Sequence, residues 1–255
     1  MILSVDVGNT NISIGAYEAE NRLFVCHILT EPDKTEVEYA MLFHHILHLH
    51  RQSEQDLEGA IISSVVPPLS PVLKAALQLC GAERVLQVGP GIRTGLNIRI
   101  DNPAQLGADF VAAAIGAMDR YPLPAIIVDL GTATKISVVD RSRTFIGGSI
   151  MPGVKVSLDA LSNRAAQLPH ISLEGPVPVI GTNTVDSMKS GVLLGAASMI
   201  DGMIARYEEA AGPTASVVAC GALADVVVPL CRREITVDST LRIDGLYAAW
   251  RKNSV

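Results

Sequence analysis

Two short segments, about half a chain apart, carry an aspartate, a glycine and small polar side chains in the same order. The first, Asp6 to Asn11, reads DVGNTN, and the second, Asp129 to Thr134, reads DLGTAT. A glycine permits a tight turn, and the amide and hydroxyl groups that follow it can surround an anion. A carboxylate repels phosphate but can hold a cation or its water shell. The two segments therefore predict metal-assisted binding of phosphate.

Each segment must lie in a turn between two strands. Apolar runs at 2–7 and 125–130 precede the two turns, and β-rich runs follow them, so that the segment 2–14 returns as 125–138 with one residue inserted after the turn. A repeat separated by half the chain indicates two similar domains rather than a solenoid, whose repeats are shorter. We place the boundary near Tyr121, with one domain at 1–121 and the other at 122–255.

The rest of the chain alternates strands with helices, which is typical of an α/β fold. Apolar spacing predicts a helix at 35–51, with Val37, Met41, Leu42, Ile46 and Leu49 as its periodic residues. Helices are predicted to dominate from Gly153 onward. The other predicted strands are 23–29, 60–66, 85–88, 96–100, 217–219 and 235–237, and the other predicted helices are 69–79, 103–118, 222–231 and 241–250.

Composition narrows the class of protein. The chain has 255 residues, a formal net charge of -6 and 18% charged residues without basic blocks, which gives no electrostatic footprint for nucleic acid. Mean hydropathy is +0.34, but the longest small-residue stretch, 185–204, is interrupted by Asp186, Lys189 and Asp201, so no membrane span is predicted. The first residues lack the basic start of a secretory signal. We expect a cytoplasmic protein with reduced cysteines.

Five segments, in register, carry a resemblance to a known family. They are 6–11, 101–109, 129–134, 147–153 and 181–191. The twin Asp-x-Gly turns resemble those of the actin, sugar-kinase and Hsp70 superfamily, and within it the five segments closely resemble type III pantothenate kinases. The resemblance implies two ribonuclease-H-like domains with mixed sheets flanked by helices. It also implies ATP-dependent phosphorylation of pantothenate to 4′-phosphopantothenate, the first step of coenzyme A biosynthesis, by a homodimer.

The resemblance also implies a role for individual residues. Asp109 would be the general base that takes the proton from the primary hydroxyl of pantothenate, and Asp129 would help to hold a monovalent cation, K+ or NH4+, in addition to the Mg2+ that accompanies ATP. The expected ATP-binding residues are Asp6, Val7, Gly8, Asn9, Thr10, Asn11, Ile12, Ser13 and Thr132. The expected pantothenate-binding residues are Ile100, Gly107, Ala108, Asp109, Phe110 and Thr184.

Four positions depart from the family pattern. Phe110 replaces an arginine, Ile100 a tyrosine, Lys135 a threonine and Ala222 a glycine. An arginine can clamp a carboxylate with two charge-assisted hydrogen bonds, whereas phenylalanine cannot. These changes leave open an alternative, a paralogue that uses another acceptor or acts as a non-catalytic, ATP-binding regulatory protein.

Two interpretations of Lys135 and of a glycine-rich helix also stay open at this stage. Lys135 either supplies positive charge beside Asp129 or points away as a solvated strand residue. Gly191, Gly195 and Gly202 lie in one predicted helix, and Ser198 adds to its small residues. That helix either packs in the core or lets a second copy approach closely.

Overall fold

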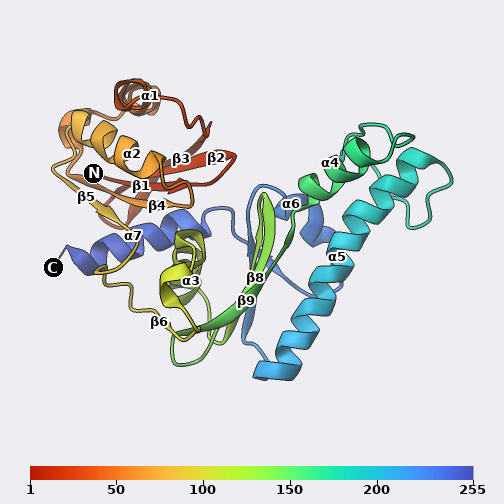
Figure 1. The fold of residues 1–255 in the computed structure, drawn as a ribbon. Coiled ribbons are helices and arrows are strands. Elements are labelled where there is room, and N and C mark those ends of the chain that lie inside the picture. The colour runs from red at the N-terminus through yellow and green to blue at the C-terminus, as the bar shows by residue number, and fades with distance from the viewer. Residues whose placement is uncertain (255) are drawn as a thin grey trace. The chain divides into compact units, whose positions relative to one another are not determined.

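The first turn segment follows the central strand of a mixed five-stranded sheet in the computed structural model, which describes residues 1–254 (Figure 1). The strands are β1 (Ile2–Val7), β2 (Asn11–Glu18), β3 (Asn21–Leu29), β4 (Gly59–Ser64) and β5 (Arg84–Gln87), in the order β3-β2-β1-β4-β5. The pairs β1–β2 and β2–β3 are antiparallel, and β1–β4 and β4–β5 are parallel. This sheet belongs to the first of two compact units, which comprises 1–97, 101–120 and the chain from Thr240 onward.

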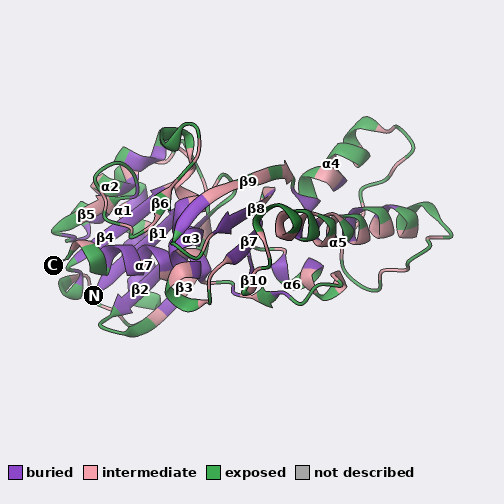
Figure 2. Ribbon diagram, turned by 90° about the horizontal axis from the view of Figure 1, so that it is seen from below, coloured by how far each residue is buried: buried purple, intermediate pink, exposed green. Residues whose placement is uncertain are grey.

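Helices cover both faces of this sheet. On one face, α1 (Glu36–Leu49) and α2 (Leu69–Leu79) form a core with the odd-numbered residues of β1. On the other face lie α3 (Ala108–Arg120) and α7 (Leu241–Asn253). Two short 3-10 helices, Glu54–Asp56 and Pro103–Gln105, complete the unit. Figure 2 shows β1, β4 and α7 as largely buried.

The helix predicted at 35–51 begins at a capping box, in which Thr35 and Glu38 exchange hydrogen bonds. Its buried face differs from the face that the sequence pattern suggested. The buried residues are Tyr39, Phe43, Ile46 and Leu47. Val37, Met41 and Leu49 are exposed by 54%, 57% and 78%. The two aromatic rings fill more of the core than the aliphatic side chains that set the predicted periodicity, and only Ile46 is common to both sets.

The second unit, 98–100 and 121–239, repeats the same topology. The strands of its sheet are β7 (Ala125–Leu130), β8 (Ala133–Val139), β9 (Thr144–Pro152), β10 (Ser216–Cys220) and β11 (Thr236–Val237), with β6 (Asn97–Ile98) at one edge, in the order β11-β10-β7-β8-β9-β6. Without β6, and read from its other end, this order is that of the first sheet. Strands β9, β8, β7, β10 and β11 then correspond to β3, β2, β1, β4 and β5. The helices α4 (Val154–Arg164), α5 (Thr184–Ala211) and α6 (Ala224–Val227) pack against one face. The structure thus confirms the repeat and the α/β class.

Several predicted elements are shorter or broken. The strand expected at 96–100 is only two residues long, and the helix expected at 103–118 is a 3-10 turn followed by α3. The helix expected at 222–231 is α6 followed by a 3-10 turn, Val228–Leu230. In the second of these broken helices Pro229 lies in the interior, where its missing N–H interrupts the backbone ladder. In the first, Leu106 has an extended backbone and ends the 3-10 turn before α3 begins.

The predicted second domain, 122–255, is corrected at its end, since α7 belongs to the first unit. Two glycines allow α7 to approach α3 closely. A Cβ atom on Gly245 would lie 2.1 Å from the carbonyl oxygen of Ala112, and one on Gly116 would lie 2.1 Å from that of Leu241. The last helix therefore belongs to the first unit because its backbone packs closely against α3, although it follows the second unit in the sequence.

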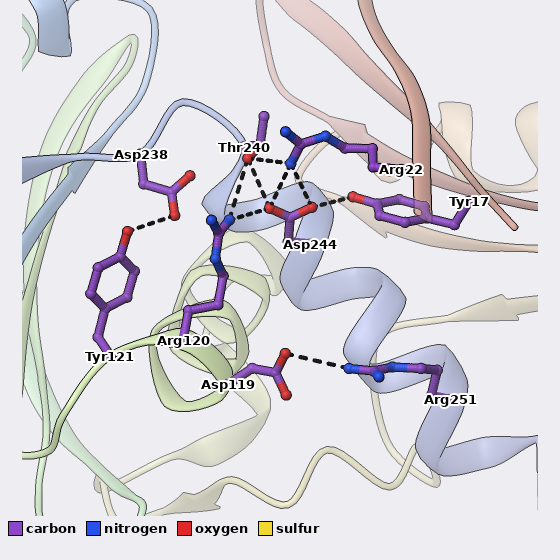
Figure 3. Close-up of polar contacts among 9 residues, drawn as sticks. All are labelled: Tyr17, Arg22, Asp119, Arg120, Tyr121, Asp238, Thr240, Asp244 and Arg251. Carbon is purple, nitrogen blue, oxygen red and sulfur yellow. Dashed lines mark hydrogen bonds and ion pairs between the residues drawn. The ribbon is translucent and has the colours of Figure 1, made fainter. Parts of the chain in front are cut away.

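A cluster of charges also fixes α7 in the first unit (Figure 3). Asp244 accepts hydrogen bonds from the Tyr17 hydroxyl at 2.5 Å and from Arg22 at 2.9 Å, and it also pairs with Arg120. These donors come from β2, β3 and α3. Burial, followed by the hydrogen bond to Asp244, raises the pKa of Tyr17 above its usual value.

Helix α5 is long and apolar enough, by length and composition alone, to cross a membrane, but core helices pass the same test. One stripe of it packs in the core of the second unit: Met188, Val192, Leu193, Ala197, Ile200 and Ile204. The rest of the helix is exposed or half-buried (Figure 2). The stripe accounts for its apolar character without a membrane.

Candidate active site

The first turn is a four-residue loop between paired Val7 and Ile12. The Gly8 N–H donates to the Asn11 carbonyl at 3.0 Å, and a Cβ atom on Gly8 would lie 3.0 Å from that same oxygen. The Thr30 hydroxyl donates to the Gly8 carbonyl at 2.7 Å. The turn is therefore held from inside the unit, while its polar residues Asn9 to Asn11 are exposed. Exposed amide and hydroxyl groups on a fixed turn are suited to anion binding.

Asp6 lies at the end of β1, directly before this turn, and is only 2% exposed. Its Oδ2 atom lies 2.8 Å from Nε of Arg242, which comes from α7. The strand residue directly opposite Asp6 is Ser13, whose hydroxyl lies 2.9 Å from Nδ1 of His27. A nearly buried carboxylate needs a counter-charge, and the guanidinium supplies it.

The second turn is one residue shorter, because Leu130 pairs with Thr134. The Gly131 N–H donates to the Ala133 carbonyl at 3.2 Å, and the Gly153 N–H donates to the Thr132 carbonyl at 3.2 Å. A Cβ atom on Gly153 would lie only 2.2 Å from that Thr132 oxygen. Glycine is therefore required where the chain enters α4, and it leaves Thr132 exposed at the tip of the turn.

A further glycine, Gly221, directly follows β10 and packs against the end of β7, where the second turn begins. Gly221 has a φ of +97°, and a Cβ atom there would lie 2.6 Å from the Leu130 carbonyl. Both features require glycine. The neighbouring Ala222, one of the four departures from the family pattern, is exposed.

Asp129 at the end of β7 also has a cationic partner. Its Oδ2 atom lies 2.8 Å from Nζ of Lys135, and the two side chains are only 5% and 12% exposed. Lys135 is the residue directly opposite Asp129 in the β7–β8 register. In this register Lys135 corresponds to Ser13, whereas the repeat predicted from sequence matched Ser13 with Ser137. Of the two interpretations of Lys135, the structure supports the one that places its charge beside Asp129.

This pairing tests whether Asp129 fits a monovalent metal ion. The lysine ammonium lies at direct contact distance from Oδ2 of Asp129, so one oxygen of this carboxylate already has a positive partner. A positive group already at that atom opposes a second one. The residues around Asp129 therefore do not fit the predicted potassium or ammonium ion.

The expected base, Asp109, lies in the first turn of α3. Its Oδ1 atom accepts a hydrogen bond from the Phe110 N–H at 2.8 Å. A Cβ atom on Gly107 would lie 2.6 Å from that carboxylate oxygen, so the glycine makes room for it. Gly107, Ala108, Asp109 and Phe110 are all half-buried. These four residues are consecutive in the chain, and the structure places them at the N-terminus of α3.

Two expected pantothenate-binding residues belong to the second unit. Ile100 is half-buried and follows β6, and Thr184 is the exposed first residue of α5, next to the helix cap at Asn183. Thr184 lines a pocket of about 510 Å³. Its other lining residues are Leu161, Leu168, Gly181, Thr182, Asn183, Ser187, Met188 and Gly191.

Within residues 1–254, no group of three or more His, Cys, Asp or Glu side chains is arranged to hold a metal ion. The Asp6 and Asp129 carboxylates belong to different units, and each has an in-chain cation.

Sequence reasoning missed Arg242 and Thr30. Arg242 lies between two buried apolar residues, Leu241 and Ile243, and a charge in such a position signals a specific partner. That signal could have marked Arg242 as important, although it could not have named Asp6. Nothing in the sequence around Thr30 indicates its bond to Gly8.

Comparisons with known proteins agree over nearly the whole chain. A family model described as type III pantothenate kinase matches residues 2–206. A type III pantothenate kinase from Halalkalibacterium halodurans is 40% identical over 253 residues, which cover 99% of this chain and 100% of that protein.

Solved structures share the fold at much lower identity. A conserved putative Baf family transcriptional activator from Campylobacter jejuni aligns with a TM-score of 0.63 at 17% identity, covering 99% of this chain and 98% of that one. A ROK hexokinase from Thermus thermophilus aligns with a TM-score of 0.55 at 13% identity, covering 99% of both chains. These neighbours confirm the two-domain, actin-like fold and, at such identities, the fold alone.

Proposed function

Because the chain belongs to the type III pantothenate kinase family, a family of phosphotransferase enzymes, we propose that it phosphorylates pantothenate with ATP. The reaction transfers the terminal phosphoryl group of ATP to the primary hydroxyl of pantothenate. It yields ADP and 4′-phosphopantothenate, as the first step of coenzyme A biosynthesis. The observation that carries the proposal is the pair of Asp-x-Gly turns, placed at equivalent strand ends of two sheets with one topology.

In this proposal ATP binds through the two turns. The segment from Asp6 to Ser13 holds phosphate groups through its exposed amide and hydroxyl groups, and Thr132 contacts them from the second unit. The internal bonds of Gly8 and Gly131 support this role, because they fix each turn before nucleotide arrives. Phosphoryl transfer depends mainly on positioning and charge neutralisation, which fixed turns provide.

Asp109 accepts the proton of the pantothenate hydroxyl. The carboxylate is held by the Phe110 N–H through one oxygen, Oδ1. An oriented carboxylate is suited to directing a hydroxyl toward a phosphorus atom. Ile100, Gly107, Ala108, Phe110 and Thr184 form the surroundings of pantothenate in this proposal.

Mg2+ accompanies ATP and, when bound, neutralises charge on the phosphate oxygens. The exposed polar residues of the turns, Asn9 and Thr132 among them, are compatible with such a nucleotide complex. The chain's own contribution is to orient the phosphate chain and the acceptor.

A coupled assay of ADP release, with and without pantothenate, tests the proposal. Release that requires pantothenate, together with a product heavier by one phosphoryl group in mass spectrometry, supports it. Release that is equal with and without pantothenate contradicts it. Binding of ATP without any release favours the non-catalytic, regulatory alternative.

A second candidate is a kinase of the same chemistry with a different alcohol as acceptor. The observation that favours it is Phe110, next to Asp109, because an aromatic ring cannot pair with the carboxylate of pantothenate. A panel of small hydroxyl compounds with and without a carboxylate, tested in the same assay, separates the two candidates.

We also propose that the protein is a cytoplasmic homodimer. Gly191, Gly195 and Gly202 are exposed on α5, and a Cβ atom on any of them would meet nothing within 4 Å. Exposed small residues on a long helix permit close approach of another helix. Light scattering during gel filtration measures the mass, and a monomer at micromolar concentration contradicts the proposal.

A further inference from the structure

Each of the two turns carries a cation of the chain against its aspartate. Nζ of Lys135 lies 2.8 Å from Oδ2 of Asp129, and Nε of Arg242 lies 2.8 Å from Oδ2 of Asp6. The two cations come from unrelated places, one from the hairpin strand β8 and the other from α7. The repeat in the sequence therefore does not explain the pairing. Equivalent aspartates of the two units each have a cationic partner, but different elements supply it.

The position of Lys135 is fixed by the strand register. Residues directly opposite each other in an antiparallel pair direct their side chains to the same face, with Cβ atoms about 5 Å apart. Lys135 and Asp129 occupy such a pair, and both side chains are almost completely shielded from water. Little solvent screening reaches the pair, so each charge depends strongly on the other.

We propose that Lys135 is the resident monovalent cation of the second turn. Its ammonium group carries the same single positive charge as K+ or NH4+ and lies 2.8 Å from Oδ2 of Asp129. The protein therefore needs no dissolved monovalent cation to balance Asp129. For nucleotide binding this inference rests on the proposed function, but the replacement of the ion by Lys135 does not.

Lys135→Thr is the variant that tests the replacement. Threonine suits a strand, removes the positive charge and adds a hydroxyl oxygen close to Asp129. The measurement is the thermal unfolding midpoint as a function of KCl concentration, with tetramethylammonium chloride keeping the ionic strength constant. No nucleotide or pantothenate is present.

We expect the midpoint of the parent protein to stay constant. The midpoint of Lys135→Thr should rise with potassium, by about 3–5 °C for each tenfold increase above the dissociation constant. If the variant is unfolded without potassium, recovery of its folded signal on adding potassium is the same result. A potassium-dependent midpoint in the parent overturns the proposal, and so does a variant that does not respond to potassium.

Two control variants distinguish loss of the cation from general damage. Lys135→Arg keeps the positive charge and should not respond to potassium. The double variant Lys135→Thr with Asp129→Asn removes both charges and should fold without responding to potassium. A response in the double variant would place the potassium site elsewhere and overturn the proposal.

A parallel titration separates this inference from the proposed function. ADP affinity, measured by calorimetry, should be independent of potassium in the parent and should gain potassium dependence, about tenfold or more, in Lys135→Thr. If ADP does not bind at all, the proposed function fails, while the thermal result still decides the role of Lys135. If ADP binds and the parent requires potassium to bind it, only the role of Lys135 fails.

Discussion

Arg242 Nε lies 2.8 Å from Oδ2 of Asp6, and this contact joins the last helix of the chain to the strand that leads into the first turn. The aspartate side chain is 3% exposed and the arginine side chain 22%. The pair is thus largely withdrawn from water. Removal of one partner from such a pair is costly, because the remaining charge keeps its desolvation penalty.

We predict that Arg242→Met lowers the free energy of unfolding by about 3 kcal/mol, near the low end for broken buried pairs because the arginine is partly exposed. Urea unfolding followed by circular dichroism measures the change. The matched control is Arg251→Met on the same helix, whose ion pairs are exposed and should contribute no more than about 1 kcal/mol. Equal losses in both variants would contradict a special role for the Asp6 pair.

Asp109→Asn should lower the turnover number by at least about a hundredfold, the smaller effect expected for a lost general base. The amide oxygen of asparagine can still accept the Phe110 N–H, so the first turn of α3 should stay intact. Steady-state ADP release measures turnover, and the exposed Asp101→Asn is the control with little expected change. Turnover within a few-fold of the parent would exclude Asp109 as the base.

Phe110→Arg should lower the KM for pantothenate by about tenfold, since a charge-assisted hydrogen bond to a carboxylate contributes about 1.5 kcal/mol or more. Because residue 110 is only half-buried, water weakens the contact, and we expect a gain near the lower end of this range. Phe110→Gln, which adds hydrogen bonds without charge, is the control. An acceptor whose carboxylate is replaced by an alcohol should show no gain. An unchanged KM would mean that the acceptor carboxylate lies elsewhere.

The parts of this fold that the sequence predicted are those set by neighbouring residues. The twin turns could be found because an apolar strand, Asp-x-Gly and a second strand follow one another directly in both halves. The hairpin register then places Lys135 opposite Asp129, although the sequence match had placed Ser137 at the position of Ser13. A turn one residue shorter shifts the register, and single-residue shifts are invisible to a pattern match.

The parts that could not be predicted depend on contacts between distant segments. Arg242 reaches Asp6 only because α7 returns to the first unit, and the return depends on glycine contacts such as Gly245 against Ala112. Local periodicity carries no information about such a return. The relation between residues in different units, such as Ile100 and Asp109, is likewise outside what a local pattern can predict.

Asp244→Asn should loosen α7 and lower the free energy of unfolding by about 1–3 kcal/mol, because several donors would lose a charged acceptor (Figure 3). The pKa of Tyr17 should fall toward its usual value, since part of its rise comes from Asp244. Urea unfolding measures the first effect and ultraviolet titration of tyrosine the second. The control is Asp119→Asn, whose pair with Arg251 is exposed. A stable variant with an unchanged tyrosine titration would show that apolar packing alone holds α7.

The cysteine thiols provide a prediction about pH. All four cysteines are free. Burial raises the pKa of Cys26 to about 11. Burial and the charge of Asp201 raise that of Cys231 to about 11, and burial and the charge of Glu54 raise that of Cys80 to about 12. At pH 8 a thiol with a pKa of 11 is thiolate in about one molecule in 1,000, compared with about one in four for an unperturbed cysteine. The greater nucleophilicity of a high-pKa thiolate offsets only part of this difference.

Alkylation of Cys26, Cys80 and Cys231 by iodoacetamide at pH 8 should therefore be at least about tenfold slower in the folded protein than in urea. The pH dependence gives the sharper test. In the folded protein the rate should keep rising, by about tenfold per pH unit, up to pH 10, because the thiolate fraction is still far from saturation. In urea the rate should level off above about pH 9, since unperturbed thiols are then mostly ionised. Mass spectrometry of peptides assigns each rate to its cysteine. A folded-state rate at Cys26 or Cys231 that levels off as in urea would mean that the thiol is not shielded as the structure indicates.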